Sequence, residues 1–153
     1  MRPRGIARGM PSQPMLSQLF IAFSLMALTV AIHASGVASA LHWVRRHAYS
    51  SQQIWRWTWL FIGVAGWMIL LHLSEITVWA SIYLWKGAIP DLQSSLYFSS
   101  VTYTTTGYGD VVLPRDFRLV GGVEALTGIL MCGWSTGFFF AVVSRVYRAA
   151  DRR

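Results

Sequence analysis

Thr104-Thr105-Thr106-Gly107-Tyr108-Gly109-Asp110 lies between two long apolar runs and constrains the fold more than any other part of the chain. Gly107 and Gly109 have no Cβ, so the backbone can alternate between right- and left-handed conformations and turn successive carbonyl oxygens toward one axis. Rings of such oxygens can replace the water around an ion. The stretch therefore predicts an ion-coordinating loop.

The composition indicates a membrane protein with an all-α fold. The chain has 153 residues, of which 54% are hydrophobic and 12% are charged. Apolar runs cover about residues 16–44, 55–85 and 119–146, and each exceeds the roughly 20 residues that a helix needs to cross the hydrocarbon layer. We therefore expect a multi-pass protein in the lipid bilayer.

A short helix is predicted between the second and third runs. Pro90 cannot continue a preceding helix, and Asp91 can cap the free amides of a new one over residues 92–103. Such a helix is too short to cross the membrane, so it must re-enter and leave on the same side, buried in protein. Its C-terminal end would favour a cation through the helix dipole.

The pattern Thr-x-x-Thr-x-Gly-Tyr-Gly, which begins at Thr102, resembles the signature of the potassium-channel pore family. The resemblance covers residues 55–146. It implies a pore domain with four parts: an outer helix at 55–85, a pore helix at 92–103, a filter at 104–110 and an inner helix at 119–146.

The resemblance also implies roles for individual residues. The carbonyls of Thr105, Thr106, Gly107 and Tyr108, with the Thr105 hydroxyl at the inner end, would bind K⁺, and Gly109 would complete the filter. Asp110 would brace the outer mouth, with Thr102 and Tyr97 as further support. This chain has Thr106 where many members have an aliphatic residue, and Tyr97 and Phe98 where Trp-rich pairs are common.

A ring of carbonyls needs several copies of the loop, and the chain contains one copy without internal repeats. Closed rotational symmetry is the simplest solution, and the resemblance implies a homotetramer. We expect passive, potassium-selective conduction across the cytoplasmic membrane. The alternatives are a less selective cation channel and a non-conducting regulatory subunit of a larger channel.

Residues 1–54 comprise a basic tail, an additional hydrophobic helix and a connection. The triplet Ala38-Ser39-Ala40 after an apolar run is also typical of a cleavable secretory signal, and a helix lying along the cytoplasmic interface is a third interpretation. We favour a third membrane helix, which places the N-terminus outside. Ser35, Gly36, Ser39 and Ala40 would suit close packing against a neighbouring helix.

The third run contains candidate gating residues. Gly128 matches the position of the family's inner-helix hinge, although close packing explains glycine in membrane helices equally well. If Gly128 is the hinge, three residues on one helical face would line the water-filled cavity: Ile129, Cys132 and Thr136. Thiol reagents added from inside should then reach Cys132.

Two acidic residues lie inside apolar runs, where charge is costly and usually faces protein or water. Glu75 follows His72 by three residues, so the pair could sense protons. We favour instead a buried hydrogen-bond role for Glu75 toward the pore helix. Glu124 is expected to brace the back of the filter.

Several functions are excluded. The net charge of +7 comes from Arg in tails and connections, which indicates membrane anchoring rather than nucleic-acid binding. We expect no enzyme, cofactor or small-molecule substrate, because no catalytic order is present and the histidines lack a metal-ligand spacing. No regular Arg series encodes a voltage sensor, and residues 147–153 form only a short basic tail.

Overall fold

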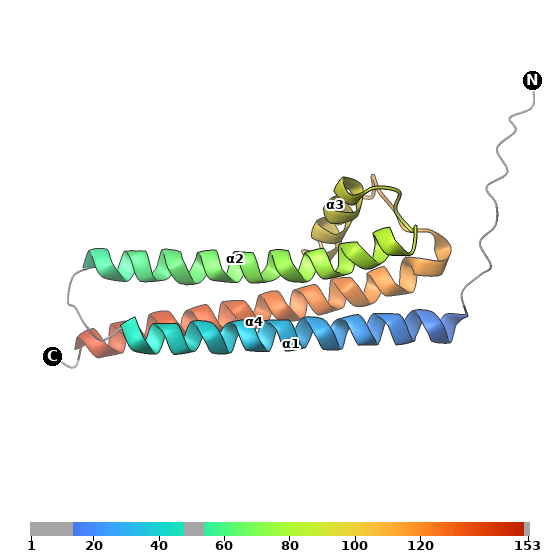
Figure 1. Cartoon of the computed structure of the whole chain (residues 1–153). Helices are drawn as coiled ribbons and strands as arrows, with labels where there is room; N and C mark the ends of the chain where they lie inside the picture. Colours follow the sequence, from blue (N-terminus) through green and yellow to red (C-terminus); the bar gives the residue numbers. More distant parts are fainter. Residues whose placement is uncertain (1–13, 48–53, 152–153) are drawn as a thin grey trace, which may run out of the picture.

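The computed structural model describes residues 14–47 and 54–151, which form helices and connections without a strand. Three long helices lie side by side: α1 (Met15–His47), α2 (Ile54–Trp85) and α4 (Arg118–Asp151) (Figure 1). A short helix, α3 (Leu92–Tyr103), and a 3-10 turn, η1 (Arg115–Phe117), lie between α2 and α4. All three long helices are long and apolar enough to cross a membrane. The predicted all-α fold with an additional N-terminal helix is confirmed.

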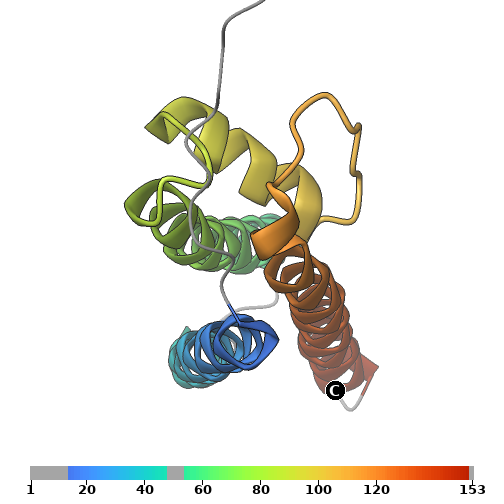
Figure 2. The same cartoon turned by 90° about the vertical axis from the view of Figure 1, so that its right-hand side faces the viewer.

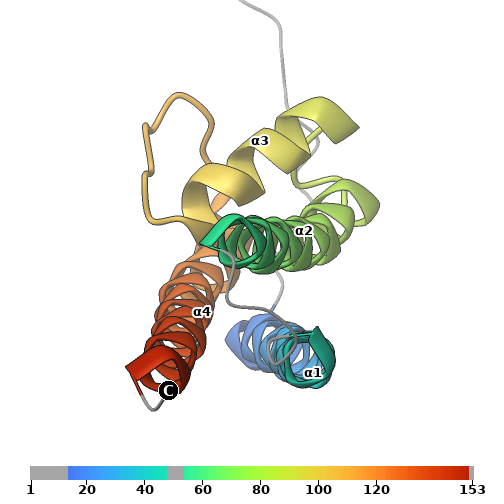
Figure 3. The same cartoon turned by 90° about the vertical axis from the view of Figure 1, so that its left-hand side faces the viewer.

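The helices run in alternating directions. α2 is antiparallel to α1 and α4, and α3 lies at the end where α2 finishes and α4 begins (Figure 1). The two end-on views place α1 on the side of the bundle away from α3 (Figures 2 and 3). α3 packs on α2 and α4, whereas α1 packs on α2 and α4 from the other side. α1 is therefore peripheral to the pore unit.

The start of α3 is fixed by Asp91. Its side chain accepts a hydrogen bond of 2.8 Å from the backbone N–H of Ser94, which satisfies an otherwise unpaired amide. The pKa of Asp91 is lowered by this bonding to Ser94. α3 spans Leu92–Tyr103, the bounds that the sequence predicts.

The inner helix is longer than predicted. α4 begins at Arg118 and continues to Asp151, so the expected separate tail at 147–153 is wrong for residues 147–151. Arg148 in the last turn donates from Nε to the carbonyl of Ser144 at 3.3 Å, and a cation there is favoured by the helix dipole. Residues 1–13, 48–53 and 152–153, including the basic N-terminal tail, lie outside the described part.

Side-chain contacts join α1 to α2. The indole N–H of Trp79 donates to Thr29 Oγ1 at 3.0 Å, and both residues are fully buried. The indole N–H of Trp67 donates to the carbonyl of Gly36 at 2.9 Å. A Cβ on Gly36 would lie 2.5 Å from a methyl group of Leu71, so the absence of a side chain permits the close approach.

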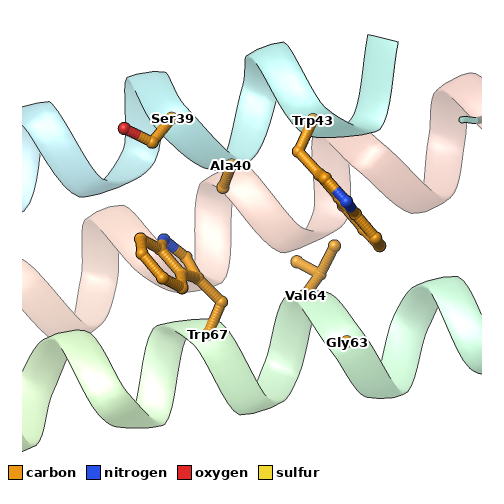
Figure 4. A pocket seen from close by; sticks show the side chains of 6 residues that line it. All are labelled: Ser39, Ala40, Trp43, Gly63, Val64 and Trp67. Carbon is orange, nitrogen blue, oxygen red and sulfur yellow. The ribbon is translucent and has the colours of Figure 1, made fainter. Parts of the chain in front are cut away.

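A cavity of about 380 Å³ lies between α1 and α2 (Figure 4), toward the end of α1 and the start of α2. The indoles of Trp43 from α1 and Trp67 from α2 flank it. Figure 4 labels the lining residues: Ser39, Ala40, Trp43, Gly63, Val64 and Trp67. Because this lining is mainly apolar, the cavity offers few hydrogen-bond partners to water.

Candidate ion-conduction site

The loop after α3 has an alternating backbone. Thr105, Gly107 and Gly109 have φ angles of 60°, 52° and 80°, whereas no positive φ occurs at Thr106 or Tyr108. Left-handed residues at every second position rotate consecutive peptide planes, so that their carbonyl oxygens can point to the same side of the loop. Thr105 is the one non-glycine residue with positive φ in the described part of the chain, a conformation that costs free energy and is often found at functional sites.

Three hydrogen bonds tie the inner half of this loop to the end of α3. The backbone N–H groups of residues 104, 105 and 107 donate to the carbonyls of Ser100, Thr102 and Val101, at 3.1, 2.9 and 3.0 Å. The carbonyl oxygen of Thr102 accepts one of these bonds, and its role as filter support stays a prediction. Every residue from Thr104 to Asp110 is exposed on the single chain, and Tyr108 is 72% exposed. A firmly anchored loop therefore presents its backbone to the surface.

The outer half of the loop is held by Tyr97 and Asp110. The Tyr97 hydroxyl, projecting from α3, donates to the Asp110 carboxylate at 2.7 Å. This hydrogen bond lowers the pKa of Asp110 below its ordinary value of 3.8, and it raises the pKa of Tyr97. Asp110 and Tyr97, which were expected to support the filter, are brought together across the loop.

Glu124 lies behind α3 rather than beside the loop. Its carboxylate is fully buried and accepts hydrogen bonds from the hydroxyls of Ser99 on α3 and Tyr83 on α2, the latter at 2.7 Å. Ser99 also donates to the carbonyl of Ile76. Glu124 thus fixes α3 to α2 and α4 from the back. Its predicted role in supporting the filter fits this position and stays a prediction.

Glu75 lies about one turn further along α3, at its last residue, Tyr103. It is fully buried and accepts a hydrogen bond from the Tyr103 hydroxyl, and His33 Nδ1 lies 2.9 Å from its carboxylate, in a contact whose direction depends on the tautomer of the ring. His72 Nδ1 lies 3.4 Å from the same carboxylate. The buried hydrogen bond between Glu75 and the pore helix that the sequence favours is thus present, with the Tyr103 hydroxyl as donor. Proton sensing by His72 and Glu75 stays a prediction.

Sequence reasoning missed several partners of these two carboxylates. His33 and Tyr103 for Glu75, and Tyr83 and Ser99 for Glu124, come from other helices, 25 to 42 residues away. One signal was available: His33 is an ionisable residue inside an apolar run, and such residues usually face a protein partner. Periodicity alone could not identify that partner.

Gly128 packs against the end of α3. A Cβ built on it would lie 2.0 Å from the carbonyl oxygen of Tyr103, directly before the loop. Of the predicted cavity residues, Ile129 and Thr136 are exposed and Cys132 is half-buried. The geometry favours close packing as the reason for glycine at 128, and the hinge and cavity roles stay predictions.

The site is therefore a short helix that two buried carboxylates fix to the flanking long helices, and a loop of alternating handedness that backbone hydrogen bonds tie to the end of that helix. A family model described as "Ion channel" matches residues 67–145, which contain most of α2, all of α3, the loop and most of α4. No curated protein and no solved structure matched the chain.

The matched region spans slightly more than half of the chain. It lies within residues 55–146, the two-helix unit that the resemblance to potassium-channel pores outlines, and the family is one of channels rather than enzymes. Together, the geometry of the loop and this match show that the chain belongs to the pore-loop ion-channel family.

Proposed function

We propose that this channel conducts K⁺ selectively and passively through a filter that four copies of residues 104–110 form together. The observation that carries the proposal is the left-handed backbone at Thr105, Gly107 and Gly109. Alternating handedness lets a chain direct consecutive carbonyl oxygens at one axis, where they can take the place of water around a dehydrated ion. The carbonyls of Thr105, Thr106, Gly107 and Tyr108 would provide the binding positions.

The exposure of the loop supports assembly around an axis. One chain provides one arc of oxygens, and an ion site needs oxygens from several directions. α1 packs on the far side of α2 and α4, so it leaves α3 and the loop free for neighbouring copies (Figures 2 and 3). α4 also has large exposed apolar side chains that protein or lipid must cover: Leu126, Ile129, Leu130 and Phe140. A closed ring satisfies these requirements.

Flux through proteoliposomes containing only this protein tests the proposal. We expect K⁺ flux far above Na⁺ flux in the wild type, and loss of selectivity or conduction in Gly107→Ala. Gly107 has a φ of 52°, a backbone conformation that residues with a Cβ rarely adopt. Gly66→Ala is the matched control, because Gly66 lies on an exposed face of α2 with nothing within 4 Å of an added Cβ.

Two other outcomes would contradict the proposal in different ways. Comparable Na⁺ and K⁺ flux would identify a less selective cation channel. If assembled protein passed neither ion over a range of pH and voltage, the chain would be a regulatory subunit of a larger channel. We place the protein in the cytoplasmic membrane, which localisation of a tagged chain would test.

A further inference from the structure

A buried polar cluster joins all four α-helices. His33 comes from α1, His72 and Glu75 from α2, Tyr103 from α3 and Ser135 from α4. The side chains of His33 and Glu75 are fully buried, and that of His72 is 19% exposed. One donor atom each of His33, His72 and Glu75 lies within 4.8 Å of the others. Such a concentration of polar groups within an apolar bundle calls for a functional explanation.

The two imidazoles are oriented alike. Nδ1 of His33 lies 2.9 Å from Glu75 Oε1, and Nδ1 of His72 lies 3.4 Å from Glu75 Oε2. The Nε2 atoms of both rings lie on the other side, 3.4 and 3.0 Å from Ser135 Oγ. The two Nδ1 atoms thus converge on the Glu75 carboxylate, while the Ser135 hydroxyl contacts both Nε2 atoms.

The hydrogen-bond inventory favours a cation at this convergence. The Ser135 hydroxyl donates to Met68 Sδ at 3.5 Å, so its two lone pairs are left to accept from the Nε2–H groups of His33 and His72. Both Nδ1 atoms then carry lone pairs that face the lone pairs of the Glu75 carboxylate. The Tyr103 hydroxyl provides one proton to this group. In this protonation arrangement, the remaining lone pairs repel one another unless a cation lies between them.

We propose that His33, His72 and Glu75 bind a divalent transition-metal ion, with Zn²⁺ as the best match. Imidazole nitrogens and one carboxylate are ligands that Zn²⁺ prefers, whereas Ca²⁺ and Mg²⁺ prefer oxygen alone. Metal-bound histidines typically donate their second N–H to an outer acceptor, and Ser135 occupies that position for both rings. The ion would connect α1 to α2 next to Tyr103.

Protons alone could also satisfy the cluster. In that arrangement His33 donates from Nδ1 to Glu75, and Ser135 donates to His33 Nε2 instead of to Met68. The carboxylate and one ring are then joined directly, and no metal ion is needed. Metal binding by the folded protein distinguishes the two arrangements, and it does so independently of whether the protein conducts K⁺.

Co²⁺ is a suitable probe, because it takes the place of Zn²⁺ and absorbs visible light in sites of low coordination number. Full-length protein in detergent would be freed of metal with a chelator and titrated with Co²⁺. We expect saturable visible absorption at one ion per chain, which added Zn²⁺ removes. Absence of saturable absorption, together with absence of Zn²⁺ binding by calorimetry, would overturn the proposal.

Substitutions locate the ion. His33→Gln and Glu75→Gln should remove the absorption, because each deletes a ligand while keeping a polar side chain of similar size. Ser135→Ala should weaken Co²⁺ binding by about 10- to 100-fold, the usual effect of losing an outer partner. His42→Gln is the matched control, because His42 lies on α1 and is exposed. Unchanged absorption in His33→Gln, or its loss in His42→Gln, would contradict the assignment.

A second measurement separates ligand loss from misfolding. Bound Cu²⁺ gives an electron paramagnetic resonance spectrum in which each coordinating nitrogen splits the signal. We expect two nitrogens in the wild type and one in His72→Gln, a variant of the partly exposed ring. Each variant would first be shown to assemble as the wild type does in metal-free buffer. A wild-type spectrum without nitrogen splitting would refute the site.

Discussion

Gly128 brings α4 against the end of α3 because it has no side chain. The carbonyl of Tyr103 lies where a Cβ would be, 2.0 Å from the ideal position. Since that carbonyl belongs to the backbone directly before the loop of residues 104–110, the two helices cannot move apart here without moving the loop. α4 and the residue that precedes the loop of residues 104–110 are therefore in direct contact at Gly128.

Gly128→Ala should destabilise the folded protein by about 1–3 kcal/mol, the usual cost of overpacking. Gly133→Ala on the same helix is the control, because nothing lies within 4 Å of its added Cβ. Unfolding in detergent would measure both. Equal stability of the two variants, with an altered open probability in Gly128→Ala alone, would favour the hinge interpretation instead.

The bond between Tyr97 and Asp110 predicts a defined dependence on pH. The pKa of Asp110 is lowered in the folded protein. The stabilisation from the hydrogen bond between Tyr97 and ionised Asp110 is therefore complete above the ordinary pKa of 3.8, and it is lost as the pH falls through the lowered pKa. Tyr97→Phe should therefore move the acid loss of K⁺ flux to higher pH, toward 3.8. Tyr147→Phe, which alters an exposed tyrosine on α4, should leave the acid profile unchanged.

Among the elements, α1 is joined to the pore unit by specific polar contacts and not by apolar packing alone. Thr29 accepts from the Trp79 indole, His33 contacts Glu75, and Gly36 accepts from Trp67. These three positions lie along one side of α1, three or four residues apart. The spacing matches one helical face, so α1 has one fixed orientation toward α2.

Thr29→Val tests this attachment. The substitution leaves the buried indole N–H of Trp79 without an acceptor, which costs about 1–3 kcal/mol. Ser39→Ala is the control, because the Ser39 hydroxyl is exposed and bonds within α1 to the carbonyl of Ser35. The free energy of unfolding in detergent would be compared for the two variants. A Thr29→Val protein as stable as Ser39→Ala would show that α1 is held by apolar contacts.

For the whole molecule, the exposure of the loop of residues 104–110 on the single chain predicts assembly. Native mass spectrometry from detergent should give a complex with four times the chain mass of 17.2 kDa. Tyr108→Ala should assemble equally well if α4 provides most of the contact area, although its K⁺ selectivity should fall. A stable monomer or dimer that still conducts K⁺ would contradict a fourfold filter.

Sequence patterns predict the parts of this fold that depend on local chemistry. Apolar run length gave the long helices, Asp91 marked the start of α3, and glycine spacing indicated the alternating loop. Long-range pairing was not predictable in the same way. His33 lies 42 residues from Glu75, and α1 is largely apolar, so its small residues indicated a face for close packing but not which helix that face meets. The contact of Gly128 with Tyr103 likewise depends on helix packing.

The antiparallel order of the three long helices determines on which side of the membrane a reporter fused to either end would lie. α1 begins at the filter end of the bundle and α4 finishes at the other end (Figure 1). A reporter fused ahead of α1 and a second one fused behind α4 would consequently face different aqueous compartments. Proteases added to sealed cells should remove only the first, and intracellular enzymes should have access only to the second.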